Sequence, residues 1–141
     1  MQTIRQVAAL PVRKTEAGSL EVLLVTSRDT GRWVLPKGWP SRRLKDQAAA
    51  AREAKQEAGV VGKISSKPIG NYSYRKIEGQ TSRLVEVSVY VLNVQKEKKR
   101  WQEQGERERR WFPVAVAARR VREPRLKLLL KALGPVGGAP K

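Results

Sequence analysis

The sequence predicts a single domain of the α/β class. Its 141 residues are the usual length of one domain, and a hydrophobic content of 40% is sufficient for one buried core. Segments with strand patterns alternate with a few helical ones, which is typical of mixed α/β folds. No internal repeat is visible. We therefore expect one folded domain over residues 1–133, followed by a short tail.

The first third of the chain is predicted to form strands joined by short turns. Apolar and β-branched residues dominate three segments, at 6–12, 20–26 and 33–35. Polar, glycine-containing segments at 14–18 and 29–31 separate these strands. Pro36 is expected to end the third strand, because proline has no backbone N–H to donate.

A helix is predicted at residues 47–58, after a loop at 37–44 that contains glycine and proline. Asp46 is a suitable N-cap residue, and four consecutive alanines raise the helix propensity of the first turns. Gly59 is expected to stop the helix, since glycine readily adopts the left-handed conformation found after a C-terminus.

The second half of the chain predicts more strands and two short helices. Strand material at 61–74 is interrupted by Pro68 and Gly70. The segment 84–94 alternates, so Val85, Val87, Val89 and Val91 are expected to share one face. The remaining expected segments are a charged loop at 95–106, a strand at 110–113, helices at 115–121 and 125–133, and a loose tail at 134–141.

Composition limits the chemistry that this chain can perform. There is no cysteine and no histidine, which excludes thiol nucleophiles, zinc thiolates and imidazole bases. A metal would therefore be a hard ion bound through oxygen, such as Mg²⁺ or Mn²⁺. The net charge of +17 favours anionic partners, nucleic acid among them. No apolar run approaches the ~20 residues of a membrane helix, so we expect no membrane contact and a cytoplasmic location.

The helix at 47–58 brings two carboxylates together. Glu53 and Glu57 are four residues apart and share one helix face. The preceding loop carries Lys37, Arg42 and Arg43, close to a helix N-terminus that favours anions. Carboxylates for a metal beside cations for phosphate are a layout suited to phosphoryl transfer. The alternative is an ordinary solvated helix face held by local ion pairs.

Residues 38–60 resemble the Nudix box, G-x5-E-x7-R-E-U-x-E-E-x-G-U, in which U is aliphatic. The residues that match in register are Gly38, Arg52, Glu53, Glu57, Gly59 and Val60. The resemblance implies an α/β/α sandwich with a mixed sheet. It also implies hydrolysis of a diphosphate linked to another group, with Mg²⁺ or Mn²⁺. By this resemblance Arg52, Glu53 and Glu57 are catalytic, and Gly38, Glu53, Gln56 and Glu57 bind the metal.

Further segments resemble the diphosphoinositol polyphosphate phosphohydrolase branch of that family. They are Ser27-Arg28, residues 33–36, Gly62-Lys63, Arg107, Arg109 and Trp111-Phe112, within a similarity over about residues 5–133. We accordingly expect the substrate ligands to be Arg28, Lys37, Arg42, Arg43 and Arg109.

Two departures from the box predict a weakened metal site. Leu44 occupies the first glutamate position, and Gln56 occupies the first position of the Glu-Glu pair. Glutamine retains an oxygen donor but lacks the negative charge, so metal affinity should fall. Acidic residues elsewhere are candidates to compensate: Glu86, Glu103, Glu106 and Glu108.

Three functions remain open from the sequence. The first is a metal-dependent pyrophosphohydrolase acting on a highly anionic small molecule, either a diphosphoinositol polyphosphate or a dinucleoside polyphosphate. The second is the same chemistry at the 5′ end of RNA, which the basic surface favours. The third is a degenerate domain that only binds polyanions, as Leu44 and Gln56 suggest. Metal-dependent turnover separates the third from the other two.

Overall fold

The computed structural model describes residues 3–133, and the tail predicted at 134–141 lies outside these residues. The elements in chain order are β1 (Thr3–Lys14), β2 (Leu20–Thr26), β3 (Trp33–Val34), β4 (Lys37–Gly38), α1 (Asp46–Ala58), β5 (Val60–Ile64), β6 (Gly70–Glu78), β7 (Thr81–Glu97), β8 (Arg109–Pro113), α2 (Val114–Arg120) and α3 (Pro124–Leu133).

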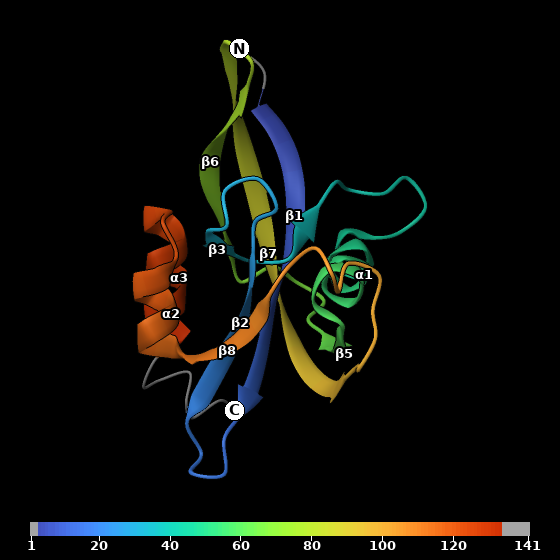
Figure 1. Ribbon diagram of the computed structural model, residues 1–141, viewed down its shortest axis with the longest axis vertical. Helices are drawn as coiled ribbons and strands as arrows, with labels where there is room; N and C mark the ends of the chain where they lie inside the picture. The colour runs from blue at the N-terminus through green and yellow to red at the C-terminus, as the bar shows by residue number, and fades with distance from the viewer. Residues whose placement is uncertain (1–2, 134–141) are drawn as a thin grey trace.

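The eight strands form one mixed sheet. The main path runs β3-β2-β1-β7-β5, with β4 paired to β1, β6 to β7 and β8 to β2. Strands β1 and β7 are parallel, and the other pairs are antiparallel. Helix α1 lies on one side of the sheet, and α2 and α3 lie on the other (Figure 1). The predicted α/β/α sandwich with a mixed sheet is confirmed.

A separate hydrophobic cluster fills each face of the sheet. Alternation along β7 serves both faces, because Val85, Val87 and Val89 pack under α2 and α3 while Tyr90 and Leu92 pack under α1. Helix α1 contributes only alanines to its cluster, namely Ala49, Ala50, Ala54 and Ala58. Such small side chains let the helix backbone lie close to the sheet, which fixes the height of its polar face above the strands.

The predicted C-terminus of α1 is confirmed, but its predicted N-cap residue is wrong. Gly59 ends the helix with φ of 67°, and its N–H bonds back to carbonyls of the last turn, as predicted. The N-cap prediction for Asp46 is wrong, because Lys45 occupies that position and no side chain caps the helix. Asp46 is the first helical residue, and its carboxylate pairs with Arg5 at 3.3 Å.

Several strands have other limits than the sequence suggested. Strands β1 and β7 extend further because ten consecutive residues of β1 pair with β7 in one continuous register. The segment predicted at 61–74 is two strands, β5 and β6, on either side of Pro68. The predicted loop at 37–44 begins with the short strand β4, which pairs with β1 and so anchors Lys37 and Gly38 beside α1. That anchor positions the site described next.

Candidate functional site

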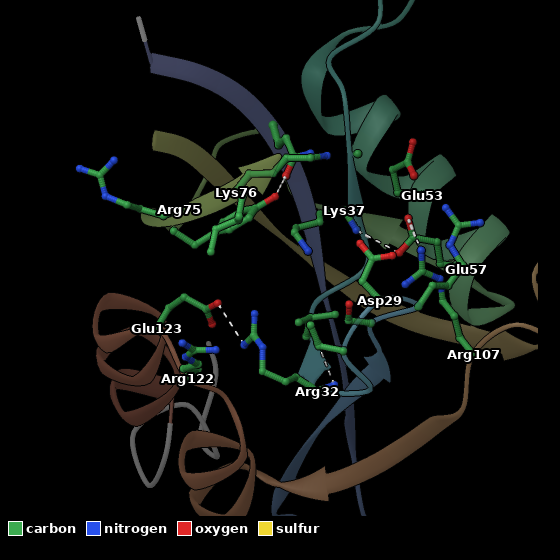
Figure 2. A pocket seen from close by; sticks show the side chains of 18 of the residues that line it. Asp29, Arg32, Lys37, Glu53, Glu57, Arg75, Lys76, Arg107, Arg122 and Glu123 are labelled. Carbon is green, nitrogen blue, oxygen red and sulfur yellow. Dashed lines mark hydrogen bonds and ion pairs between the residues drawn. The ribbon is translucent and has the colours of Figure 1, made fainter. Parts of the chain in front are cut away.

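A cleft of about 780 Å³ runs from α1 to the link between α2 and α3. Figure 2 shows Glu53 and Glu57 on α1 at one end and Arg122 and Glu123 at the other, with Lys37 between them. The cleft is therefore lined by residues from both halves of the chain, and β4 contributes Lys37 and Gly38 to it.

The carboxylates of Glu53 and Glu57 lie together at the α1 end. Glu57 is 5% exposed, and its Oε1 accepts a hydrogen bond from the backbone N–H of Lys37 at 3.3 Å. Glu53 is half-buried against Gly38, where a β-carbon would collide with its carboxyl group. A side chain at position 38 would therefore displace the carboxyl group of Glu53. The backbone of β4 consequently holds both carboxylates in place.

The electrostatics of this end favour neutralisation of the carboxylate pair. Burial raises the pKa of Glu57 to about 8, with Glu53 and Glu103 adding to the rise and Arg107 opposing it. Burial also raises the pKa of Glu53. Desolvation lowers the pKa of Lys37, against the attraction of Glu57. Two carboxylates that burial makes costly to ionise would be stabilised by a bound cation.

We predict that the metal-free protein loses stability as pH rises from about 4.5 to about 8. A carboxyl group whose folded pKa exceeds its unfolded value holds an extra proton in the folded state. Stability is then greatest below the unfolded value and declines until the folded pKa is passed. Unfolding by urea at several pH values in chelator should show this slope, and Glu57→Gln should flatten it. An equal slope in both proteins would contradict the burial effect.

Glu103 is the late acidic residue that joins this end of the cleft. Its carboxylate accepts a hydrogen bond from Nε of Arg107 at 2.7 Å, and Nη2 of Arg107 lies 3.9 Å from Glu57. The backbone N–H of Glu103 donates to the carbonyl of Gln56 at 3.0 Å. Glu103 thus lies beside Gln56, the residue that lacks the expected negative charge. Arg107 lies between the carboxylates of Glu103 and Glu57.

The other three acidic candidates have different surroundings. Glu106 pairs with Arg28 at 2.8 Å, and Glu108 pairs with Arg110 at 3.5 Å. Glu86 is exposed on β7, opposite Ser73. Of the four candidates, the structure brings only Glu103 close to Glu57 through a shared partner.

The donor set at the α1 end fits a hard metal ion in part. The oxygens of Glu53 and Glu57 and the adjacent backbone of Gly38 are of the type that Mg²⁺ and Mn²⁺ prefer. Within residues 3–133, no group of three or more Asp, Glu, His or Cys side chains is arranged to hold a metal. Gln56 is half-buried and does not line the cleft. Further ligands would therefore have to come from a bound phosphate or from water.

The predicted cationic residues are divided between the cleft and other places. Lys37 lines the cleft, as does Arg28, whose guanidinium is paired with Glu106. Arg42 and Arg43 are exposed on the loop before α1 and do not line the cleft. Arg52 is also exposed outside it, although its charge lowers the pKa of Glu53. The structure thus brings two of these five cations into the cleft.

Arg109, expected to bind substrate, has a structural role instead. Its guanidinium donates to the carbonyls of Ala58, Gly59 and Lys98 and stacks on Trp101 at 3.9 Å. These bonds satisfy the exposed carbonyls at the end of α1. A guanidinium occupied in this way is not available to phosphate, so we leave Arg109 out of the site.

Sequence reasoning missed several residues that line the cleft. They are Gln6, Arg32, Arg122 and Glu123. Arg107, which also lines the cleft, is marked in the sequence only by the resemblance to the family branch. Pro124 at the first position of α3 is the one sequence signal that could have marked the neighbouring Glu123 as the start of a helix. Nothing in the sequence distinguished Arg32 from the other exposed-looking arginines, because its position depends on how β3 meets the α2–α3 link.

The mixed sheet between helices, with a carboxylate pair on α1 beside Gly38 of β4, agrees with the Nudix resemblance of residues 38–60. The sequence model of the NUDIX domain family matches residues 3–132 of this chain. The chain is 32% identical over 118 residues to Nudix hydrolase 16, mitochondrial, of Arabidopsis thaliana, covering 80% of this chain and 65% of that one. It is 37% identical over 97 residues to diphosphoinositol polyphosphate phosphohydrolase 3-beta of Bos taurus, covering 67% and 56%.

A solved structure has the same fold. The C. elegans Ap4A hydrolase binary complex superposes with a TM-score of 0.66 at 21% identity, covering 91% of this chain and 93% of that one. The chain belongs to the Nudix hydrolase family. It spans about half to two thirds of the length of the curated relatives that it matches. Among residues 3–133, no helix is long and apolar enough to cross a membrane.

Proposed function

We propose that this domain is a Mg²⁺- or Mn²⁺-dependent pyrophosphohydrolase that cleaves a diphosphate bond in a highly anionic small molecule. The observation that carries the proposal is the buried carboxylate pair of Glu53 and Glu57, with Lys37 next to it in one cleft. Family membership supports the reaction class. The burial of the pair, which raises the pKa of Glu57, supports the need for a metal.

Each residue at the α1 end has a role that its position supports. Glu53, Glu57 and the carbonyl of Gly38 would hold the metal, which when bound neutralises phosphate charge and acidifies a coordinated water. Glu57 is fixed by the N–H of Lys37, so it acts as a rigid ligand. Glu53 is the more accessible carboxylate and can accept the proton of the attacking water. The ammonium group of Lys37 orients the diphosphate.

The charge of the chain and the names of two similar proteins support the proposed substrate class. One relative is a diphosphoinositol polyphosphate phosphohydrolase, and one structural neighbour is an Ap4A hydrolase. The compounds in these two names are dense anions, which suits a chain of net charge +17. Cleavage at the 5′ end of RNA is the second candidate, and the exposed Arg42 and Arg43 outside the cleft favour it.

The experiment that tests the proposal is a panel of diphosphate compounds. Diphosphoinositol polyphosphates, dinucleoside polyphosphates and 5′-triphosphorylated RNA are incubated with Mg²⁺ or Mn²⁺, and released phosphate or nucleotide is measured. We expect turnover of at least one small molecule and none in chelator. A protein that binds these anions but hydrolyses none would be the degenerate binding domain.

Gln56→Glu should lower the metal concentration needed for activity. The substitution restores a negative charge one residue from Glu57, and a nearby negative charge attracts a divalent cation even though position 56 does not line the cleft. We expect the half-saturating Mg²⁺ concentration to fall by about tenfold, with a smaller change at saturating metal. Titration of the initial rate with Mg²⁺ measures this. An unchanged half-saturation point would show that a charge at position 56 does not act on the ion.

Lys37→Gln should raise KM by about tenfold and change kcat little. An ammonium that holds phosphate in the ground state and in the transition state alike contributes uniform binding, and a charged hydrogen bond of this kind is worth about 1.5–3 kcal/mol. The control is the double variant Arg42→Gln, Arg43→Gln, which removes more charge outside the cleft. An equal rise in KM for the control would contradict the assignment of Lys37.

A further inference from the structure

The link between β7 and β8, residues 98–108, lies against the C-terminal end of α1 (Figure 1). The last four carbonyls of a helix have no partner within the helix and must find one elsewhere. In α1 the carbonyl of Lys55 accepts from the N–H of Gly59 at 3.1 Å, a common bond at a helix end. The carbonyl of Gln56 accepts from the backbone N–H of Glu103 in the link, at 3.0 Å.

Two side chains satisfy the remaining carbonyls of that last turn. Nε1 of Trp101 donates to the carbonyl of Glu57 at 3.2 Å. Nη1 of Arg109, the first residue of β8, donates to the carbonyl of Ala58 at 2.9 Å. The positive guanidinium also complements the negative end of the helix dipole. The backbone of Glu57 is therefore held from outside the helix.

Arg109 connects this end of the helix to the sheet. Its backbone pairs with Val25 of β2. Nη2 of Arg109 donates to the carbonyl of Lys98 at 3.0 Å, and the guanidinium lies 3.9 Å from the ring centre of Trp101. A β-carbon on Gly59 would lie 2.6 Å from that ring and 2.8 Å from Nη1 of Arg109. The two side chains thus form one stacked unit in direct contact with the helix stop.

The rest of α1 does little to fix its position along the sheet. Its contribution to the hydrophobic cluster is alanine alone, and no side chain caps its N-terminus. Large side chains that interlock with their neighbours hold a helix in place, whereas a row of methyl groups does so weakly. Glu57 is consequently placed by polar contacts at both of its ends. Its Oε1 accepts from the N–H of Lys37, and its carbonyl accepts from Trp101.

We propose that Trp101 and Arg109 are positioning residues, which hold Glu57 in the geometry that the metal site requires. The proposal rests on the proposed function and adds two residues that do not line the cleft. Their effect passes through the backbone of Glu57. Removing a group that orients a metal ligand lowers affinity or activity about 10- to 100-fold, and a displacement of about 1 Å in a catalytic group has effects of similar size.

The first test measures the position of Glu57 without metal or turnover. In chelator, hydrogen exchange of the Lys37 amide, followed by NMR, reports its bond to Oε1 of Glu57. Arg109→Gln should speed this exchange about tenfold. The matched control is Arg110→Gln, an exposed neighbour on the same strand, which should leave the exchange unchanged. Equal exchange in Arg109→Gln and the parent would overturn the proposal.

The second test measures kinetics with a dinucleoside polyphosphate and Mg²⁺. Arg109→Gln should lower kcat about tenfold and leave KM within about twofold, because Lys37 still binds the phosphate. The control for stability is Val114→Ala, which removes two methyl groups from the hydrophobic cluster on the other face of the sheet. It should lower the melting temperature and keep the kcat of the parent. An equal fall in kcat in both variants, at a temperature where both are folded, would show an effect of stability and contradict the positioning role.

Trp101→Phe keeps the proposal testable if Arg109→Gln does not fold. The substitution retains a ring for the guanidinium of Arg109 but removes the donor to Glu57. Exchange at Lys37 should rise and kcat should fall, each about threefold or more, the size expected for one hydrogen bond. Unchanged values in this folded variant would refute the role of Trp101.

The two tests separate this proposal from the proposed function. A parent protein that hydrolyses no diphosphate, but whose Lys37 exchange depends on Arg109, would reject the proposed function alone. Hydrolysis by the parent, with neither exchange nor kcat dependent on Arg109 or Trp101, would reject the positioning role alone.

Discussion

Glu57→Gln is expected to lower the rate of diphosphate hydrolysis by on the order of 100-fold or more at saturating substrate. The substitution keeps the shape of the side chain and its acceptor for the N–H of Lys37. It removes the charge that binds the metal. Initial rates with Mg²⁺ and with Mn²⁺ check this expectation, and Glu16→Gln is the control in an exposed turn. A variant as active as the parent would show that α1 does not carry the metal site.

The same substitution should make the protein more stable at neutral pH. Burial raises the pKa of Glu57 to about 8, so its ionised form is unfavourable in the folded metal-free protein. Replacing it by a neutral side chain should increase the free energy of unfolding on the order of 1–3 kcal/mol at pH 7. Loss of activity with a gain in stability would separate a functional carboxylate from a structural one.

Gly38→Ala is expected to lower the rate on the order of 100-fold, because misplacement of a catalytic group by about 1 Å has effects of this size. The added β-carbon would collide with the carboxyl group of Glu53. The backbone at Gly38 has no positive φ, so alanine itself is tolerated there. The main loss is expected in kcat, since Lys37 still binds the phosphate.

Gly105→Ala is the matched control for that variant. Gly105 lies in the loop between β7 and β8, also has no positive φ, and has nothing within 4 Å of an added β-carbon. We expect its activity and its melting temperature to equal those of the parent. If Gly38→Ala retained full activity, Glu53 would be free to move without consequence, and its role as a positioned ligand or base would be wrong.

The fold could be predicted largely from local patterns. The alternation along residues 84–94, the alanine-rich helix and the helix stop at Gly59 each depend on residues that are close in sequence. The structure confirms all three. The limits of β1 and β7 could not be predicted, because their added length depends on pairing with one another. The N-cap prediction for Asp46 failed, since Lys45 takes that position and the carboxylate of Asp46 pairs with a distant residue, Arg5.

The candidate site was predictable only where it lies within one segment. Glu53, Glu57 and Gly38 belong to one motif, and β4 places them together. Arg107 and Glu103 reach the same place from a loop about 50 residues later, and Arg32 and Glu123 meet across the cleft. Spacing along the chain does not predict contacts between residues so far apart in sequence. Arg109 was misassigned for the same reason, since its partners are carbonyls of another element.

The central claim is that a site with Gln56 in place of a carboxylate still works with a metal. The most direct measurement is the initial rate of hydrolysis of a dinucleoside polyphosphate by the parent protein as Mg²⁺ or Mn²⁺ is increased from zero to saturation. We predict a rate that is absent in chelator and rises to a plateau, with a half-saturating metal concentration that falls as substrate is raised, because the diphosphate supplies ligands. No turnover at saturating metal, while the protein still binds the compound, would contradict the account.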